Sequence, residues 1–111
     1  MAESFFYLTT TGRKTGLRRE IEIWYVEYQG KYYLVSERRE ESKWLQNLLA
    51  EPRVTFSIGP REAQQAVVAL TNAVARPVSV ESEVDLVSAV RRLMDAKYKW
   101  SDGLVVEIAP V

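Results

Sequence analysis

Residues 20–36 read EIEIWYVEYQGKYYLVS, and this stretch decides the fold class of the chain. Acidic and apolar residues alternate at its start, which is the period-two pattern of a strand with one buried face. Gln29-Gly30 then separates this run from a second one, rich in tyrosine and aliphatic residues, over residues 31–36. The pattern predicts a β-hairpin made of antiparallel strands at 20–28 and 31–36.

Further strands are predicted on both sides of this hairpin. Residues 5–11 are largely aromatic and β-branched and end at Gly12, residues 53–58 alternate, and residues 104–108 are aliphatic after an Asp-Gly turn. The stretch 63–78 has alanines that suit a helix and valines that suit a strand. We interpret it as a long strand, because the helix that follows it is much better marked.

Two helices are predicted between the strands. A short one spans about 42–51, with Ser42 as N-cap, apolar residues at helical spacing, and Pro52 at its end. A longer one spans about 82–97, beginning at the start signal that Ser82 and Asp85 form. About six mostly antiparallel strands with two helices describe a single α+β domain over residues 1–111, and closure of its sheet into a small barrel hides the exposed edges.

The composition narrows the possible functions. Fifteen basic and fifteen acidic residues give no net charge, which argues against a surface committed to nucleic acid or to an anionic membrane. Cysteine and histidine are both absent, which excludes thiol nucleophiles, disulfides, serine–histidine triads and Cys/His zinc sites. We expect no metal, and we expect a soluble cytoplasmic protein, since no apolar stretch reaches membrane-spanning length.

A basic turn is the most informative local feature of the sequence. Four cations fall within seven residues with no acid among them: Arg13, Lys14, Arg18 and Arg19. Glycines bracket the first part of this run, at Gly12 and Gly16, and allow a tight turn that exposes backbone amides. Such a turn can bind a phosphate or a polyanionic tail, whereas the alternative is a solvated hairpin turn with ordinary surface charges.

The basic turn belongs to a longer pattern. That pattern comprises LTTTGRKTG at 8–16, Arg19, WYV at 24–26, YYLVS at 32–36, WLQNL at 44–48 and AEPRV at 50–54. In this order, these segments resemble the deazaflavin-dependent nitroreductase family. The resemblance implies a flavin-binding split β-barrel of the pyridoxamine 5'-phosphate oxidase-like kind, with the deazaflavin F420 as cofactor and FMN as the alternative.

The resemblance also implies roles for residues of the basic turn. Arg13, Lys14 and Arg19 correspond to family residues that hold the phosphate-bearing tail of the cofactor. Thr15 and Gly16 form the turn between them. We therefore expect this end of the barrel to bind the tail.

Other segments of the pattern are implied to surround the same cofactor. Ser36 falls where the family's third strand ends beside the tail. The segment that contains Ile21 and Ile23 would run along the flat ring system, and Trp24 would face the substrate pocket. No catalytic residue is assigned, because hydride transfer is chemistry of the cofactor and the protein supplies placement.

The resemblance implies hydride transfer from reduced F420 to a small electrophilic acceptor. Two alternatives stay open: an FMN-binding split-barrel protein, and a non-catalytic dimeric module that has lost its cofactor. The second is motivated by acids in the segment 37–41, which is commonly glycine-rich in the family. We also expect a homodimer, because the hairpin carries more aromatic surface than one small core hides: Trp24, Tyr25, Tyr28, Tyr32 and Tyr33.

Overall fold

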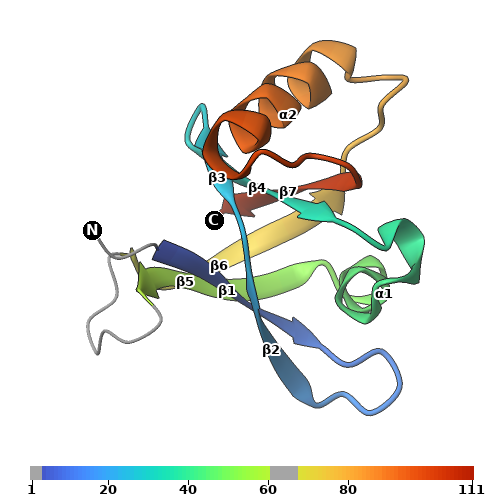
Figure 1. Ribbon diagram of the computed structural model, residues 1–111. Coiled ribbons are helices and arrows are strands. Elements are labelled where there is room, and N and C mark those ends of the chain that lie inside the picture. The colour runs from blue at the N-terminus through green and yellow to red at the C-terminus, as the bar shows by residue number, and fades with distance from the viewer. Residues whose placement is uncertain (1–3, 61–67) are drawn as a thin grey trace.

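The computed structural model describes residues 4–60 and 68–111, and its architecture is a curled antiparallel sheet with two helices (Figure 1). The described strands form one sheet in the order β2-β1-β5-β6-β7-β4-β3. Their bounds are β1 (Ser4–Thr11), β2 (Arg18–Ile23), β3 (Val26–Tyr28), β4 (Lys31–Ser36), β5 (Arg53–Pro60), β6 (Val68–Pro77) and β7 (Leu104–Pro110).

The connection between the two edge strands explains why the sheet curls. Strands β2 and β3 lie at opposite ends of the strand order, yet only Trp24 and Tyr25 separate them in the chain. Two residues span less than about 8 Å, so the two edges of the sheet must come close together. This topology gives the split β-barrel that the sequence predicts.

The prediction of one continuous strand over 20–28 is wrong. The structure divides it into β2 and β3, so that seven described strands replace the expected six. The break falls at Tyr25, whose backbone N–H and carbonyl bond the hydroxyl of Tyr98. Periodicity within the segment cannot reveal this break, since its cause lies more than seventy residues away in the sequence.

The other strand predictions agree with the structure. Strands β1, β4, β5 and β7 cover the predicted ranges 5–11, 31–36, 53–58 and 104–108. Within the ambiguous stretch 63–78, β6 confirms the strand interpretation from residue 68 onward, and residues 63–67 lie outside the described part of the chain. Strand β5 extends two residues beyond the predicted range and ends at Pro60.

Both predicted helices are present, as α1 (Lys43–Ala50) and α2 (Val84–Tyr98), and a short 3-10 helix, η1 (Arg39–Glu41), precedes α1. Ser42 is the N-cap of α1 as predicted, although its side chain makes no capping hydrogen bond. The predicted start of the longer helix at Ser82 is wrong, because its N-cap is Glu83. The Ser82 hydroxyl instead bonds the hydroxyl of Ser79.

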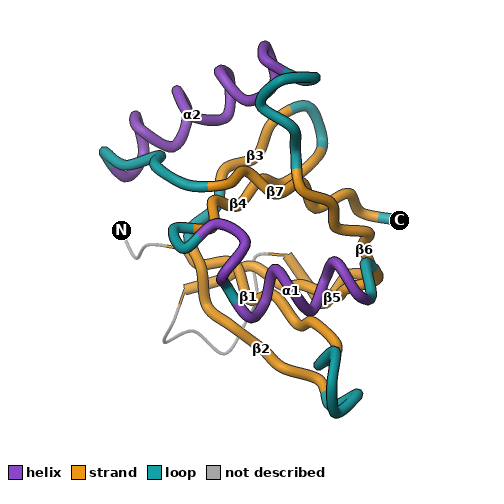
Figure 2. The backbone as a smooth tube through the Cα atoms, turned by 90° about the vertical axis from the view of Figure 1, so that its right-hand side faces the viewer, coloured by secondary structure: helices purple, strands orange, loops and turns teal. Residues whose placement is uncertain are grey.

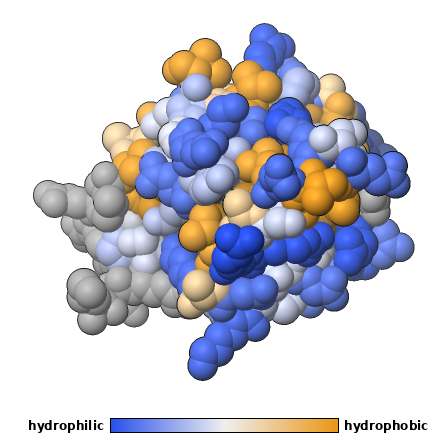
Figure 3. Space-filling view, turned by 90° about the horizontal axis from the view of Figure 1, so that it is seen from above, coloured by the Kyte–Doolittle hydropathy of each residue, from blue (hydrophilic) through white to orange (hydrophobic). Residues whose placement is uncertain are grey.

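The apolar side chains form two cores. The first fills the barrel and includes Phe6 and Phe56, whose rings stack with centroids 4.8 Å apart, together with Leu45 and Leu48 of α1. The second lies under α2 and includes Val87, Val90 and Met94 of that helix. Figure 2 shows α2 above β3, β4 and β7, with α1 further down beside β1 and β5. Seen from above, apolar groups on this surface are broken up by polar ones (Figure 3).

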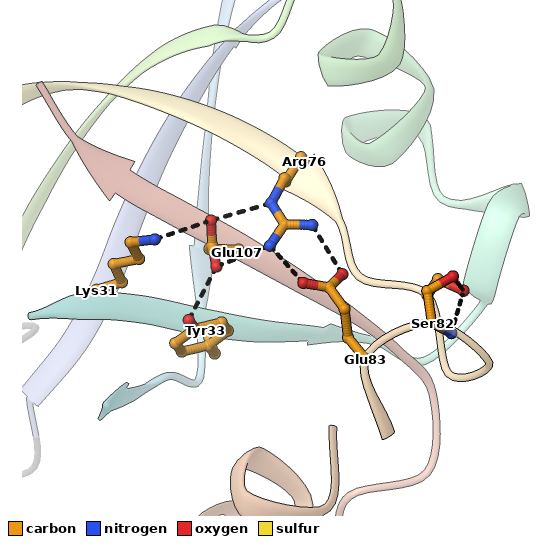
Figure 4. A network of polar contacts seen from close by, with 7 residues as sticks. Lys31, Tyr33, Arg76, Ser82, Glu83 and Glu107 are labelled. Atoms are coloured by element: carbon orange, nitrogen blue, oxygen red, sulfur yellow. Dashed lines mark hydrogen bonds and ion pairs between the residues drawn. The ribbon is translucent and has the colours of Figure 1, made fainter. Parts of the chain in front are cut away.

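A buried carboxylate joins the start of α2 to the barrel (Figure 4). Glu107 of β7 is only 4% exposed, and its oxygens accept from the Tyr33 hydroxyl at 2.9 Å and from Arg76 Nε at 3.1 Å. Arg76 also donates to both oxygens of Glu83, each at 2.8 Å. Burial and the bond to Glu107 raise the pKa of Tyr33 well above its ordinary value. The network therefore holds Glu83, the N-cap of α2, against the sheet.

Candidate functional site

Two adjoining hollows lie along β2 and the start of α1. The larger encloses about 730 Å³, and we name it the tryptophan hollow; its lining is Ile21, Glu22, Ile23, Trp24, Val35, Glu37, Arg38, Ser42, Lys43, Trp44 and Trp100. The smaller encloses about 450 Å³, and we name it the basic hollow; its lining is Thr10, Gly12, Arg13, Lys14, Thr15, Arg19, Glu20, Ile21, Lys43, Trp44 and Asn47. Since both share Ile21, Lys43 and Trp44, they form one elongated site.

The turn between β1 and β2 forms one end of the basic hollow. The Gly12 N–H donates to the carbonyl of Leu17 at 2.7 Å, and the Gly16 N–H donates to the carbonyl of Gly12 at 2.8 Å. Gly16 has a φ of +72°, in the left-handed region that favours glycine. A Cβ at Gly12 would lie 2.9 Å from Thr15 Oγ1, closer than side-chain contacts allow. The two glycines therefore determine the path of this turn.

Helix α1 holds the turn through Asn47. The Asn47 Oδ1 atom accepts the backbone N–H of Arg13 at 3.1 Å, and Nδ2 donates to Thr10 Oγ1 at 3.2 Å. Both Asn47 and Thr10 are buried, so these bonds form away from competing water. The cation-bearing turn is thus fixed relative to the helix that lines the opposite wall.

The charges that line the two hollows are mostly positive. Arginine and lysine side chains come from the turn, from β2 and from both sides of the α1 start: Arg13, Lys14, Arg19, Arg38 and Lys43. Among the side chains that the structure describes, no ion pair involves any of these five cations. Acids also contribute to the lining, at Glu20, Glu22 and Glu37. A cluster of unpaired cations in a concave site is a suitable partner for a phosphate or another multiply charged anion.

Arg18 does not belong to this cluster, contrary to the expectation of a four-cation site. Neighbouring strand residues point to opposite faces, so Arg18 and Arg19 diverge. The Arg18 guanidinium donates to Thr55 Oγ1 at 2.9 Å, away from the hollow that Arg19 lines.

The tryptophan hollow has flat apolar walls. Its indole rings come from three elements far apart in the sequence, at Trp24, Trp44 and Trp100. Trp24 is 40% exposed and stacks on the ring of Tyr98, with centroids 4.4 Å apart and an angle of 1° between the planes. Trp100 meets Trp24 edge-on at 6.3 Å. Walls of this kind suit a planar ring system.

The predicted cofactor residues are largely brought together. Arg13, Lys14, Thr15 and Arg19 line the basic hollow. Gly16 belongs to the turn and determines its path without lining either hollow.

The two predicted ring-side residues, Ile21 and Ile23, and the predicted substrate-pocket residue, Trp24, all line the tryptophan hollow. Ser36 does not line either hollow, because it is only 1% exposed. Its hydroxyl lies 2.6 Å from that of Ser42 and donates to the carbonyl of Arg39 at 2.8 Å. In this position Ser36 supports the segment that carries Arg38.

Several lining residues were not identified from the sequence: Arg38, Lys43, Trp44, Asn47 and Trp100. Trp44 packs against the barrel core while also lining both hollows. The sequence does contain a signal for two of them, because the spacing of three residues places Trp44 and Asn47 on one face of the same helix. Trp100 follows the end of α2 and had no local signal.

The residues that the structure describes include no group of three or more acidic side chains placed to hold a metal ion. Within the same residues, neither helix has the length and hydrophobicity needed to cross a bilayer.

Comparisons with solved structures show the fold. The heme storage protein HutZ from Vibrio cholerae is 19% identical, with a TM-score of 0.74 over 96% of this chain and 81% of that one. An FAD-binding protein from Mesorhizobium loti is 12% identical, with a TM-score of 0.75 over 99% and 83%. An F420 reductase is 14% identical, with a TM-score of 0.69 over 96% and 86%. These neighbours share the split β-barrel.

Comparisons of sequence identify the family. A search of the curated proteins finds no match to this chain. The sequence pattern of the F420H(2)-dependent quinone reductase family matches residues 1–101, which is nearly the whole chain. The chain therefore belongs to the F420H(2)-dependent quinone reductase family.

Proposed function

We propose that this protein binds F420 across the two hollows and uses it to reduce a small electrophilic acceptor. The observation that carries the proposal is the continuity of the site. Cations that pair with no acid among the described side chains line one end, three indole rings line the other, and Ile21, Lys43 and Trp44 belong to both. An elongated molecule with an anionic tail and a flat ring system matches this arrangement.

The basic hollow fits the phosphate-bearing tail. The guanidinium groups of Arg13 and Arg19 can each bind a phosphate in the bidentate manner typical of arginine. Lys14 and Lys43 add point charges from the turn and from the facing helix. Among the described residues that line this hollow, Glu20 is the only acid, and the cations outnumber it four to one.

The tryptophan hollow fits the ring system and an acceptor beside it. When bound, F420 supplies the hydride for the reduction. The chain orients the reactants, since the indoles of Trp24, Trp44 and Trp100 provide flat apolar walls. Close alignment of the reacting groups along these walls lowers the barrier.

The segment 37–41 is compatible with binding in the structure. Glu37 lines the tryptophan hollow, but Arg38 lines it as well and offsets that charge. Arg39 does not line the tryptophan hollow and instead forms an ion pair with Asp102 at 2.9 Å. The acids that motivate a module without cofactor therefore do not leave a net negative wall.

A titration with F420, with FMN and with buffer alone tests the proposal. A ligand that binds only the folded state raises the melting temperature. We expect F420 to raise it and to quench tryptophan fluorescence, and we expect reduced F420 to be oxidised when a small quinone is added. Binding of FMN alone would favour the FMN alternative, and no response to either would favour the module without cofactor.

A further inference from the structure

The C-terminal end of α2 reaches across the gap between the two edges of the sheet. At this gap the chain passes from β2 to β3 through Trp24 and Tyr25. Two consecutive helix residues, Lys97 and Tyr98, contact the passing backbone. The contact involves the wall of the tryptophan hollow, because Trp24 lines it.

Both backbone polar groups of Tyr25 are held by the helix end. The Tyr98 hydroxyl accepts the N–H of Tyr25 at 3.1 Å and donates to its carbonyl at 3.0 Å. Lys97 Nζ donates to the same carbonyl at 3.0 Å and lies 3.8 Å from the centroid of the Tyr25 ring. These bonds replace the sheet hydrogen bonds that a continuous strand would make here.

The same tyrosine also orients the indole of Trp24. The two rings are parallel and 4.4 Å apart, so one face of Trp24 is covered by Tyr98. Trp100, two residues beyond Tyr98, meets the indole edge-on. Position and tilt of this part of the wall thus depend on the end of α2.

We propose that Tyr98, assisted by Lys97, is a positioning residue that fixes Trp24 as the acceptor-side wall of the tryptophan hollow, and that this wall selects planar acceptors. The inference rests on the proposed function and deepens it. An indole held in one orientation limits the thickness of the acceptor that can lie along it, whereas an indole that changes its orientation does not. The Tyr98 hydroxyl, engaged with both polar groups of Tyr25, serves this placement.

The rest of α2 is anchored independently of this contact. Val87, Val90 and Met94 are buried in the second core. The N-cap residue Glu83 is bound by Arg76. Removing the hydroxyl of Tyr98 therefore leaves the helix docked and the ring stack available, which makes Tyr98→Phe an informative variant.

The test compares Tyr98→Phe and Lys97→Met with the wild type. We expect acrylamide to quench the tryptophan fluorescence more readily in both variants, because each removes one of the contacts that hold the backbone beside Trp24, and we expect this difference to disappear in a Trp24→Phe background. We expect KM for a planar quinone to rise by roughly tenfold in Tyr98→Phe, the effect of losing hydrogen bonds of ordinary strength. The dissociation constant of F420 should change less than about twofold, since the basic hollow is untouched.

A double-mutant cycle separates positioning from a general structural role. Trp24→Phe alone and combined with Tyr98→Phe should show that the effect of Tyr98→Phe on KM disappears once the indole is absent. Tyr28→Phe serves as the matched control, because Tyr28 is a half-buried tyrosine outside both hollows. It should change neither quenching nor KM.

Two results would overturn the inference. One is unchanged quenching and unchanged KM in both variants, and the other is an effect on KM that is the same with and without Trp24. Failure of the proposed function is distinguishable, because it would appear as absence of F420 binding by the wild type. The quenching comparison needs no F420, and the difference between proteins with and without Trp24 decides whether Tyr98 holds this indole.

Discussion

The side-chain oxygen of Asn47 accepts the backbone N–H of Arg13 at 3.1 Å, so helix α1 and the cation-bearing turn are held together. Replacing Asn47 with leucine would leave this N–H and the buried Thr10 hydroxyl without their partner. We expect a loss of about 1–3 kcal/mol in the free energy of unfolding. We also expect weaker F420 binding, because the turn is no longer fixed. Urea denaturation and an F420 titration measure the two effects.

The control for this variant is Leu49→Ala on the same helix, because Leu49 is exposed and lines neither hollow. Its F420 affinity should equal that of the wild type. Equal affinities of the Asn47→Leu protein and the wild type would show that the turn holds its shape without the helix.

The double variant Arg13→Ala with Lys14→Ala should lose most of its affinity for F420. Each charged contact to a phosphate contributes about 1.5–3 kcal/mol, so two lost contacts weaken binding roughly a hundredfold or more. The remaining binding should depend less on salt, since fewer ionic contacts are left to screen. Fluorescence titrations at two ionic strengths measure both changes, and a melting curve verifies folding.

Arg18→Ala supplies the matched control for the loss of charge. Arg18 lies in the same basic stretch but bonds Thr55 and does not line the hollow. Its removal should leave affinity within about twofold of the wild type. An unchanged dissociation constant in the double variant, with normal folding, would place the tail elsewhere.

The sequence predicts the elements of this fold well, because each has a strong local pattern. Strands β1, β4, β5 and β7 carry apolar and β-branched runs, and α1 begins at its predicted cap. Where prediction fails, the cause is a distant contact. The break at Tyr25 comes from Tyr98, and no pattern within residues 20–28 encodes it.

In the candidate site, too, residues in local motifs could be predicted and residues placed by distant contacts could not. Most of the turn residues and Trp24 could be assigned from the resemblance, and Arg13, Lys14, Thr15, Arg19 and Trp24 do line the hollows. Arg38 and Trp100 could not, since they reach the tryptophan hollow only through the curl of the sheet and the path after α2. The burial of Ser36 could not be predicted either, because it depends on the turn that follows this residue.

Gly103→Ala should destabilise the fold. A Cβ at this position would clash with the carbonyl oxygen of Ser36, and backbone atoms cannot move aside as a flexible side chain can. Overpacking of this kind costs about 1–3 kcal/mol. Urea denaturation measures the cost, with Ser101→Ala in the same loop as control. Equal midpoints for the two variants would contradict the expected clash.

We expect the protein to be a homodimer, although the aromatic hairpin contributes less exposed surface than its sequence suggests. Tyr33 is buried and the other three tyrosines of the hairpin are partly buried, so mainly Trp24 stays exposed. Two further apolar side chains lie on the outer face of β6, at Leu70, which is 73% exposed, and at Val74. Exposed apolar groups that share one face favour association.

Light scattering on a size-exclusion column measures this directly. The wild type should show about twice the chain mass of 12.8 kDa, and Leu70→Glu should shift the population toward the monomer. A single species at the monomer mass in the wild type at micromolar concentration would refute the dimer.

Lowering the pH should decrease the free energy of unfolding, partly through protonation of Glu83. Its two hydrogen bonds with Arg76 lower the pKa of the Glu83 carboxyl below its ordinary value of 4.5. The unfolded chain therefore binds this proton at a higher pH than the folded protein does, so stability falls as the pH decreases from that value through the lowered pKa. Glu83→Gln removes this dependence, and its urea midpoint should fall less steeply between pH 5 and pH 3 than that of the wild type. The slope need not vanish, because Arg53 lowers the pKa of Glu51 in the same way. Identical slopes for the two proteins would show that the Arg76 contact does not persist in solution.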